Sequence, residues 1–153
     1  MLRRSVAENL AYPLMLLKTP KDQIDMAVDH WLGQIGLESS RGAQATRLSG
    51  GERQKLAIAR ALIRKPDVLF LDEPSANLDG HATREIEALL HEVANAGTRL
   101  VMATHDMGQA RRLANDVVFL LNGRVHEYGL AEPLFSTPST LELIAFLRGD
   151  IVS

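Results

Sequence analysis

Apolar side chains in the first third of the chain recur at the spacing of a helix. The repeating positions are Ile24, Val28, Leu32 and Ile35. Returning every three or four residues, they predict an amphipathic helix with one buried face. Thr19-Pro20 predicts its start, with the threonine as cap and the proline in the first turn, and Gly36 predicts its end. The polar residues 38–47 that follow are predicted to form a loop.

Two short segments have the form of a capping box, a serine followed by glutamate three residues later. The first, Ser5-Val6-Ala7-Glu8, predicts a helix that runs to about residue 17 and is bent or interrupted at Pro13. The second, Ser49-Gly50-Gly51-Glu52, predicts a helix that stops before Pro66. Asp79 is predicted to cap a further helix, which ends near Gly97.

Strands are predicted where apolar residues run without interruption. Residues 67–71 do not alternate apolar with polar, so we expect a strand buried on both faces, as in a parallel sheet. Residues 100–103 predict a second strand of this kind. Asn122-Gly123, between apolar segments 117–121 and 124–128, predicts a β-hairpin.

The order of these elements predicts an α/β fold, a helical subdomain followed by strand–helix units of a mainly parallel sheet. We expect three segments along the chain. They are a helical subdomain at 1–47, a core part at 48–130 and C-terminal helices at 131–153.

Composition narrows the possible partners and compartments. The 153 residues carry a net charge of -2, which gives no reason to expect nucleic acid as a partner. There is no cysteine, which excludes disulfides and cysteine metal sites. We find no signal peptide and no stretch near the ~20 apolar residues that cross a bilayer. A role at a membrane would therefore come through a partner.

The start of the second capping box is a candidate phosphate clamp. A helix N-terminus presents N–H groups and partial positive charge, and Gly50 and Gly51 let the backbone approach a phosphate. Ser49 adds a hydroxyl group. The competing interpretation is an ordinary capped helix start, and these four residues taken alone favour it.

Polar residues at the ends of the two predicted strands form the second candidate site. Ligands of open α/β sheets bind at the carboxyl edge. There Asp72 can hold Mg²⁺, and Glu73 can orient and deprotonate an attacking water. His105 follows the second strand and can bond a γ-phosphate. The competing interpretation is that both strands simply end in polar residues.

The order of all these motifs resembles the cassette of the ABC (ATP-binding cassette) ATPase family over about residues 5–128. Leu48-Ser49-Gly50-Gly51-Glu52 is similar to the signature motif, with glutamate where glutamine is frequent. The resemblance implies Asp72 as the Mg²⁺ ligand, Glu73 as catalytic base and His105 as the switch histidine. It also implies a D-loop at Ser75-Ala76-Asn77-Leu78-Asp79, and it implies that Glu52 and Asp79 belong to the nucleotide-binding residues together with Ser49, Gly50 and Gly51. Two such cassettes face head to tail, so the signature of one closes on ATP held by the other.

One family motif has no counterpart in this sequence. The phosphate loop has the form Gly-x-x-x-x-Gly-Lys-Ser/Thr, and none of the four lysines in this chain follows a glycine. We therefore expect the chain to resemble the C-terminal part of a cassette, by truncation, an alternative start or gene fragmentation. It should be inactive alone.

The resemblance implies an ATP-binding subunit of an ABC transporter, an importer, with ATP and Mg²⁺ as cofactors. Its expected partners are a second cassette and a transmembrane permease, which would place it in the cytoplasm on the inner face of the membrane. The opening segment resembles oxyanion importers of the tungstate or molybdate kind. The alternatives are a soluble ABC protein of translation or DNA repair, and a non-catalytic remnant.

Overall fold

The computed structural model describes residues 3–150, which form two compact units, the first ending at Ala103 and the second beginning at Thr104. In the first unit the helices are α1 (Val6–Leu16), α2 (Lys21–Ile35), α3 (Gly50–Leu62) and α4 (Gly80–Asn95). Its strands are β1 (Val68–Asp72) and β2 (Arg99–Ala103). Two short 3₁₀ turns, η1 (Glu38–Ser40) and η2 (Ala45–Arg47), lie in the segment predicted as a loop.

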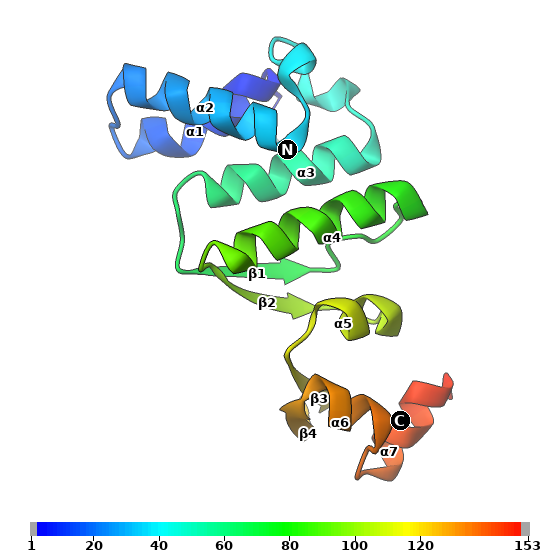
Figure 1. Ribbon diagram of the computed structural model, residues 1–153. Helices are drawn as coiled ribbons and strands as arrows, with labels where there is room; N and C mark the ends of the chain where they lie inside the picture. Colours follow the sequence, from blue (N-terminus) through cyan, green and yellow to red (C-terminus); the bar gives the residue numbers. More distant parts are fainter. Residues whose placement is uncertain (1–2, 151–153) are drawn as a thin grey trace. The chain divides into compact units, whose positions relative to one another are not determined.

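The first unit is built in layers that Figure 1 shows from top to bottom. α1 and α2 pack on α3, α3 packs on α4, and α4 lies over the parallel pair β1–β2. Each helix contributes a buried stripe to these contacts, such as Leu56, Ile58, Ala59 and Leu62 of α3. Glycine ends α2 as predicted, since Gly36 has a φ of 66°.

Three local predictions for this unit are wrong. Thr19 does not cap α2, because the N-cap is Pro20, which makes no side-chain capping bond, and Thr19 N–H instead donates to Leu14 O at 3.1 Å. α1 continues through Pro13, so the predicted interruption there is wrong, whereas the bend stays a prediction. β1 and β2 are not buried on both faces, since Phe70 is 75% and Val101 44% exposed.

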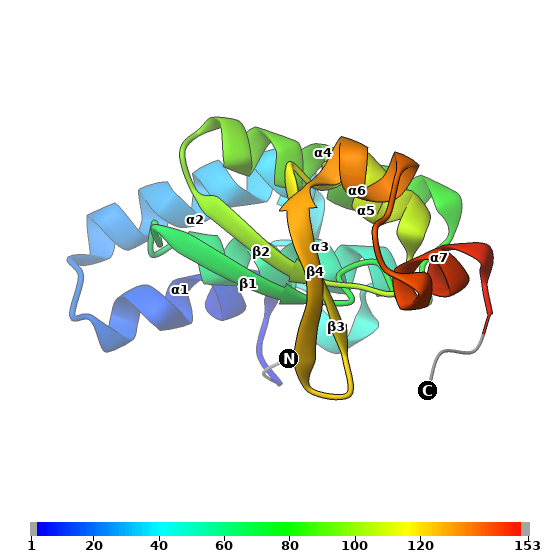
Figure 2. The same ribbon diagram turned by 90° about the horizontal axis from the view of Figure 1, so that it is seen from below.

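The exposure of β1 follows from the layering. The helices of the first unit cover one face of the strand pair, where Leu69 is 7% exposed. In Figure 2 the strands lie in front of these helices. The opposite face carries Val68, Phe70 and Val101, all of them exposed.

The second unit contains the predicted hairpin and two further helices after it. Its elements are α5 (Met107–Leu113), β3 (Asp116–Leu121), β4 (Arg124–Leu130), α6 (Ala131–Ser136) and α7 (Leu141–Arg148). The antiparallel pair β3–β4 turns at Asn122 and Gly123, whose φ angles of 51° and 71° suit a two-residue hairpin. The core of the unit consists of Ala110, Phe119, Ala131, Leu134, Phe135 and Leu143.

The carboxylate of Glu127 ties β4 to the start of α7. It accepts from Ser139 N at 2.9 Å, Thr140 N at 3.1 Å and Thr140 Oγ1 at 2.8 Å. These bonds, the backbone bond from Ser139 foremost, lower the pKa of Glu127. Thr140 in turn caps α7 by accepting from Leu143 N.

The described strands therefore form one parallel and one antiparallel pair, in a mixed α/β structure. The three-segment division expected from the sequence stays a prediction, and its outer ends lie outside residues 3–150. No helix in the described part of the chain is both long and apolar enough to span a membrane.

Candidate functional site

The start of α3 forms the predicted capping box. Ser49 Oγ accepts from Glu52 N at 3.3 Å, and Ser49 N donates to Glu52 Oε2 at 2.8 Å. The backbone bond from Ser49 is the main cause that lowers the pKa of Glu52, which keeps this carboxylate ionised. Within residues 3–150, nothing accepts from the N–H groups of Gly50 and Gly51. Both are therefore able to donate to an anion at the positive end of the helix.

The two glycines meet different surroundings. A Cβ added to Gly51 would stand 2.7 Å from the Cβ of Ala82 in α4, a separation that two side chains cannot share. A Cβ on Gly50 would meet only the Cδ2 end of Leu78, at 3.4 Å. Gly51 thus allows α3 and α4 to touch, whereas Gly50 is exposed at the surface.

Asp72 is the last residue of β1, and Glu73 begins the turn that follows. Glu73 N donates to Ala103 O at 2.9 Å, so the parallel ladder extends to this residue. Its φ of 45° lies in the left-handed region, which costs a residue other than glycine of order 1 kcal/mol or more. Lys18, Lys65 and Asn122 share a positive φ and lie outside the candidate site, so this backbone conformation fits both the catalytic interpretation of Glu73 and a plain turn after the strand.

The segment predicted as the D-loop is a pair of tight turns. Ala76 N donates to Glu73 O, and Leu78 N donates to Ser75 O. Asn77, between them, has a φ of 61°. These turns carry the chain from the end of β1 to the start of α4, beside Gly50.

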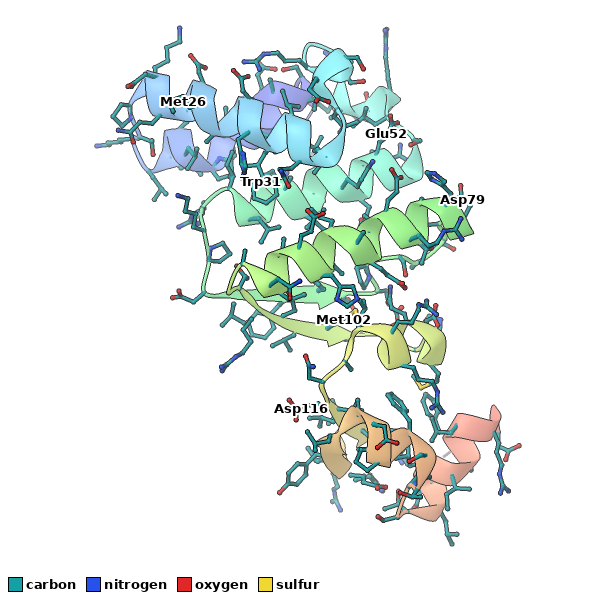
Figure 3. The ribbon with its side chains drawn as sticks, in the orientation of Figure 1. Met26, Trp31, Glu52, Asp79, Met102 and Asp116 are labelled. Atoms are coloured by element: carbon teal, nitrogen blue, oxygen red, sulfur yellow. The ribbon has the colours of Figure 1, made fainter. Side chains whose placement is uncertain are left out.

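Asp79 caps α4 with its carboxylate. Asp79 Oδ1 accepts from His81 N at 2.8 Å and from Ala82 N at 2.9 Å. These two bonds, that from Ala82 first, lower the pKa of Asp79. Figure 3 shows Asp79 and Glu52 at the starts of neighbouring helices. The nucleotide contact that the resemblance implies for Asp79 stays a prediction.

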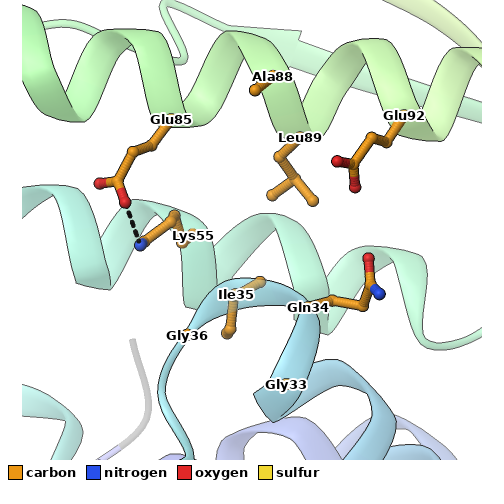
Figure 4. Close-up of a pocket in the computed structure, with 9 residues that line it drawn as sticks. All are labelled: Gly33, Gln34, Ile35, Gly36, Lys55, Glu85, Ala88, Leu89 and Glu92. Atoms are coloured by element: carbon orange, nitrogen blue, oxygen red, sulfur yellow. Dashed lines mark hydrogen bonds and ion pairs between the residues drawn. The ribbon is translucent and has the colours of Figure 1, made fainter.

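One turn further on, an ion pair joins the same two helices. Lys55 Nζ lies 3.2 Å from Glu85 Oε1, and the Lys55 side chain is only 13% exposed. Figure 4 shows this pair at the rim of a depression of about 330 Å³ between α4 and the end of α2. The depression contains none of the predicted site residues.

His105 belongs to the second unit, next to the start of α5. Asp106 caps that helix by accepting from Gln109 N at 2.9 Å, and Thr104 Oγ1 accepts from Asp106 N at 3.0 Å. The first unit, by contrast, brings the clamp residues 49–52 together with the D-loop and Asp79. Asp72 and Glu73 lie at the end of its parallel pair.

The residues present fit a magnesium ion that is bound together with a nucleotide. Residues 3–150 contain no group of three or more His, Asp or Glu side chains that would hold a metal ion by themselves. Mg²⁺ in phosphoryl-transfer sites uses one or two carboxylates and completes its shell with water and phosphate oxygens. A single aspartate at the strand end suits that arrangement.

Fold and motifs together define part of an α/β cassette, and the comparisons with known proteins agree. Residues 1–76 match the model of the ABC transporter family. The chain is 43% identical to the tungstate uptake system ATP-binding protein TupC of Peptoclostridium acidaminophilum, over 83% of this chain and 60% of that protein. It is 35% identical to the histidine/lysine/arginine/ornithine transport ATP-binding protein HisP of Escherichia coli, over 96% of this chain and 58% of that protein.

The fold is also similar to that of a solved structure. The protein cbiO1 from Clostridium perfringens, described as part of the ABC transporter complex cbiONQ, matches with a TM-score of 0.81 and 31% identity, over 90% of this chain and 55% of that one. The chain belongs to the ABC transporter ATP-binding proteins, and it spans about three fifths of the length of the two curated relatives. The predicted family and fold class are confirmed.

Sequence reasoning missed two features of this site. The contact of Gly51 with Ala82 leaves no signal in the sequence, because an alanine in a helix is unremarkable. The Lys55–Glu85 pair joins residues 30 positions apart on different helices, so helical spacing does not indicate it.

Proposed function

We propose that this chain supplies the signature half of an ATP site in an ABC transporter. Ser49, Gly50 and Gly51 close on the γ-phosphate of ATP that a second cassette holds, with Glu52 fixing the capping box. The observation that carries this proposal is the pair of N–H groups on Gly50 and Gly51 that nothing in the described chain accepts. A helix start with open donors and exposed glycine suits a phosphate.

In the same proposal, the strand end carries the chemistry of ATP hydrolysis. Asp72 would hold Mg²⁺, which would neutralise negative charge on the phosphates when bound. Glu73 orients a water and accepts its proton, and His105 bonds the γ-phosphate. These roles need a phosphate loop, and residues 1–153 do not contain its motif. The chain by itself is therefore expected not to bind ATP tightly and not to hydrolyse it.

The relatives support a role in import. Two of them are ATP-binding proteins of uptake or amino-acid transport systems, and the resemblance of the opening segment to oxyanion importers agrees with the tungstate relative. We infer a permease subunit and a second cassette as partners, a cytoplasmic position on the inner face of the membrane, and an oxyanion as the solute. Nucleic acid is not among the inferred partners.

The test measures binding of this chain to a full-length relative that supplies ATP. The tungstate uptake protein of P. acidaminophilum is loaded with Mg²⁺ and a non-hydrolysable ATP analogue, and association is followed by sedimentation. We expect association only with nucleotide present. Ser49→Ala should weaken it by about tenfold, the scale of one hydrogen bond to a charged group.

Ser5→Ala is the matched control, since it removes the same cap from α1. It should lower stability as Ser49→Ala does and leave association unchanged. Association without nucleotide, or an equal loss for both variants, would contradict the proposed clamp. The same chain alone should show no low-micromolar binding of labelled ATP.

A further inference from the structure

The contact between α3 and α4 occurs at the second glycine of the proposed clamp. Gly51 faces Ala82 so closely that an added Cβ would come within 2.7 Å of the Ala82 Cβ and 3.8 Å of its Cα. Both of these atoms are fixed to the backbone of α4, so they cannot move aside as the end of a flexible side chain can. The position of α4 therefore limits where the turn at Gly51 can lie.

Ala82 is itself held in place from two directions. Its N–H donates to Asp79 Oδ1 at 2.9 Å, which fixes it to the end of the D-loop. One turn along both helices, Lys55 and Glu85 pair at 3.2 Å. Residues three or four apart lie on one helix face, so Gly51 and Lys55 of α3 face Ala82 and Glu85 of α4. We call this row of two contacts the α3–α4 seam.

We propose that Ala82 is a positioning residue for the nucleotide clamp, acting through Gly51. The D-loop ends in the cap of α4, the cap holds Ala82, and Ala82 sets the distance of the Gly51 backbone from α4. This inference rests on the proposed function, and it gives the two glycines different tasks. Gly50 presents an open surface, whereas Gly51 is required by the seam.

A double-mutant cycle on the full chain tests the seam. Gly51→Ala favours the helix by intrinsic propensity, but it overfills the seam, so the unfolding midpoint should fall by about 5 °C. In the Ala82→Gly background the methyl has room, and the same change should raise the midpoint. Gly50→Ala is the control, because it makes the same chemical change one residue earlier. It should shift the midpoint equally in both backgrounds.

The second measurement is nucleotide-dependent association with the tungstate uptake protein, loaded with Mg²⁺ and the ATP analogue. Gly51→Ala should weaken association about tenfold or more, because a shift of the turn moves its donors off the phosphate. The double variant Gly51→Ala/Ala82→Gly should return to within about threefold of the unmodified chain. Recovery of this kind is not expected from stability alone, since Ala82→Gly by itself weakens α4.

The outcomes separate the two proposals. If the unmodified chain fails to associate, the proposed function is wrong and the positioning role falls with it. If the unmodified chain associates but Ala82→Gly does not rescue Gly51→Ala, only the positioning role is wrong. A Gly51→Ala variant that melts no lower than the unmodified chain would also overturn it.

Discussion

The starts of α1 and α3 share one hydrogen-bond pattern and differ in the two residues inside it. In α1, Ser5 N donates to Glu8 Oε2 at 2.7 Å and Glu8 N to Ser5 Oγ at 3.2 Å. In α3 the corresponding distances are 2.8 and 3.3 Å. In both, the backbone bond from serine is the first cause that lowers the pKa of the glutamate.

The difference lies in the next two backbone donors. In α1, Val6 N donates to Ala43 O and Ala7 N to Arg41 O, both at 3.0 Å, and the Val6 side chain is fully buried. In α3 the same two positions are Gly50 and Gly51, whose N–H groups have no acceptor in the described part of the chain. One helix start is completed by the protein itself and the other is left open.

This comparison separates what stabilises a helix from what binds a ligand. The capping box satisfies one backbone donor of the helix in each case, so it is a device of stability. In the proposed function, the capacity to hold a phosphate comes from the two residues inside the box, whose N–H groups no loop in the described part of the chain covers. A search for capping boxes alone would therefore rank α1 and α3 as equal candidates.

The largest expected effect is a loss of ATP turnover in a variant of Glu73. It would show that the start of α3 and the carboxylate at the end of β1 have separate roles. We consider a cassette in which a family phosphate-loop segment, taken from the tungstate relative, is joined ahead of this chain. Glu73→Gln keeps the size of the side chain but cannot accept a proton. ATP turnover should fall by about 10²-fold or more, while nucleotide binding and closure of the two cassettes persist.

Asp72→Asn in the same cassette is the companion variant, and it should weaken Mg²⁺-dependent nucleotide binding itself. ATP affinity, turnover and the dimer fraction distinguish the two roles. Near-normal hydrolysis by Glu73→Gln would show that this carboxylate is not the base. Loss of closure in that variant would show that the clamp and the strand end do not act separately.

The next prediction exchanges residues between the two helix starts. Gly50→Val gives α3 the residue that α1 has at that position, and its bulk beside the open donors should weaken nucleotide-dependent association by about tenfold. The reciprocal Val6→Gly removes a buried side chain and adds a glycine to α1. It should cost about 2–3 kcal/mol of stability and leave association unchanged.

Association and denaturant unfolding are measured on both variants. If Val6→Gly weakens association as much as Gly50→Val does, at a temperature where both variants are folded, the claim that only the start of α3 binds nucleotide is wrong. The same claim is wrong if Gly50→Val changes the stability of the chain but not its association.

Several features of the fold and of the candidate site could be predicted from local sequence patterns. Both capping boxes, the Asp79 cap and the Asn122-Gly123 hairpin were predictable because each depends on residues within four positions of one another. The strand ends were predictable because apolar runs stop at them. At the strand end the local pattern left two interpretations of Glu73 open, a catalytic carboxylate and a plain polar ending. The family resemblance favoured the first, and that role stays a prediction.

What the sequence could not reveal depends on residues distant in the chain. The carbonyl groups of Arg41 and Ala43 reach α1 from a segment that looks like a plain loop. The Gly51–Ala82 contact joins α3 and α4, which are separated along the sequence by β1. The exposed Phe70 was predicted as buried, because an apolar run shows that a strand suits burial and does not show how many layers cover it.

The smallest expected effect is a pH dependence that the two boxes should share. The pKa values of Glu8 and Glu52 are lowered from 4.5 in the folded chain, because each ionised carboxylate accepts a backbone N–H. A lowered pKa means that the stabilisation is fully present above the unfolded value of about 4.5, and that it is lost as the pH falls through the folded value.

Denaturant unfolding between pH 7 and pH 3 should therefore show stability declining below about pH 4.5. Glu8→Gln and Glu52→Gln each keep an oxygen that accepts the serine N–H but remove the titration. Each should make the decline shallower by a similar amount, and the double variant should flatten it further. Asp79 and Glu127, whose pKa values are also lowered, keep some decline in every variant. If Glu52→Gln changes the slope and Glu8→Gln does not, the two boxes are not equivalent in the folded chain. The difference between the helix starts would then extend beyond Gly50 and Gly51 to the boxes themselves.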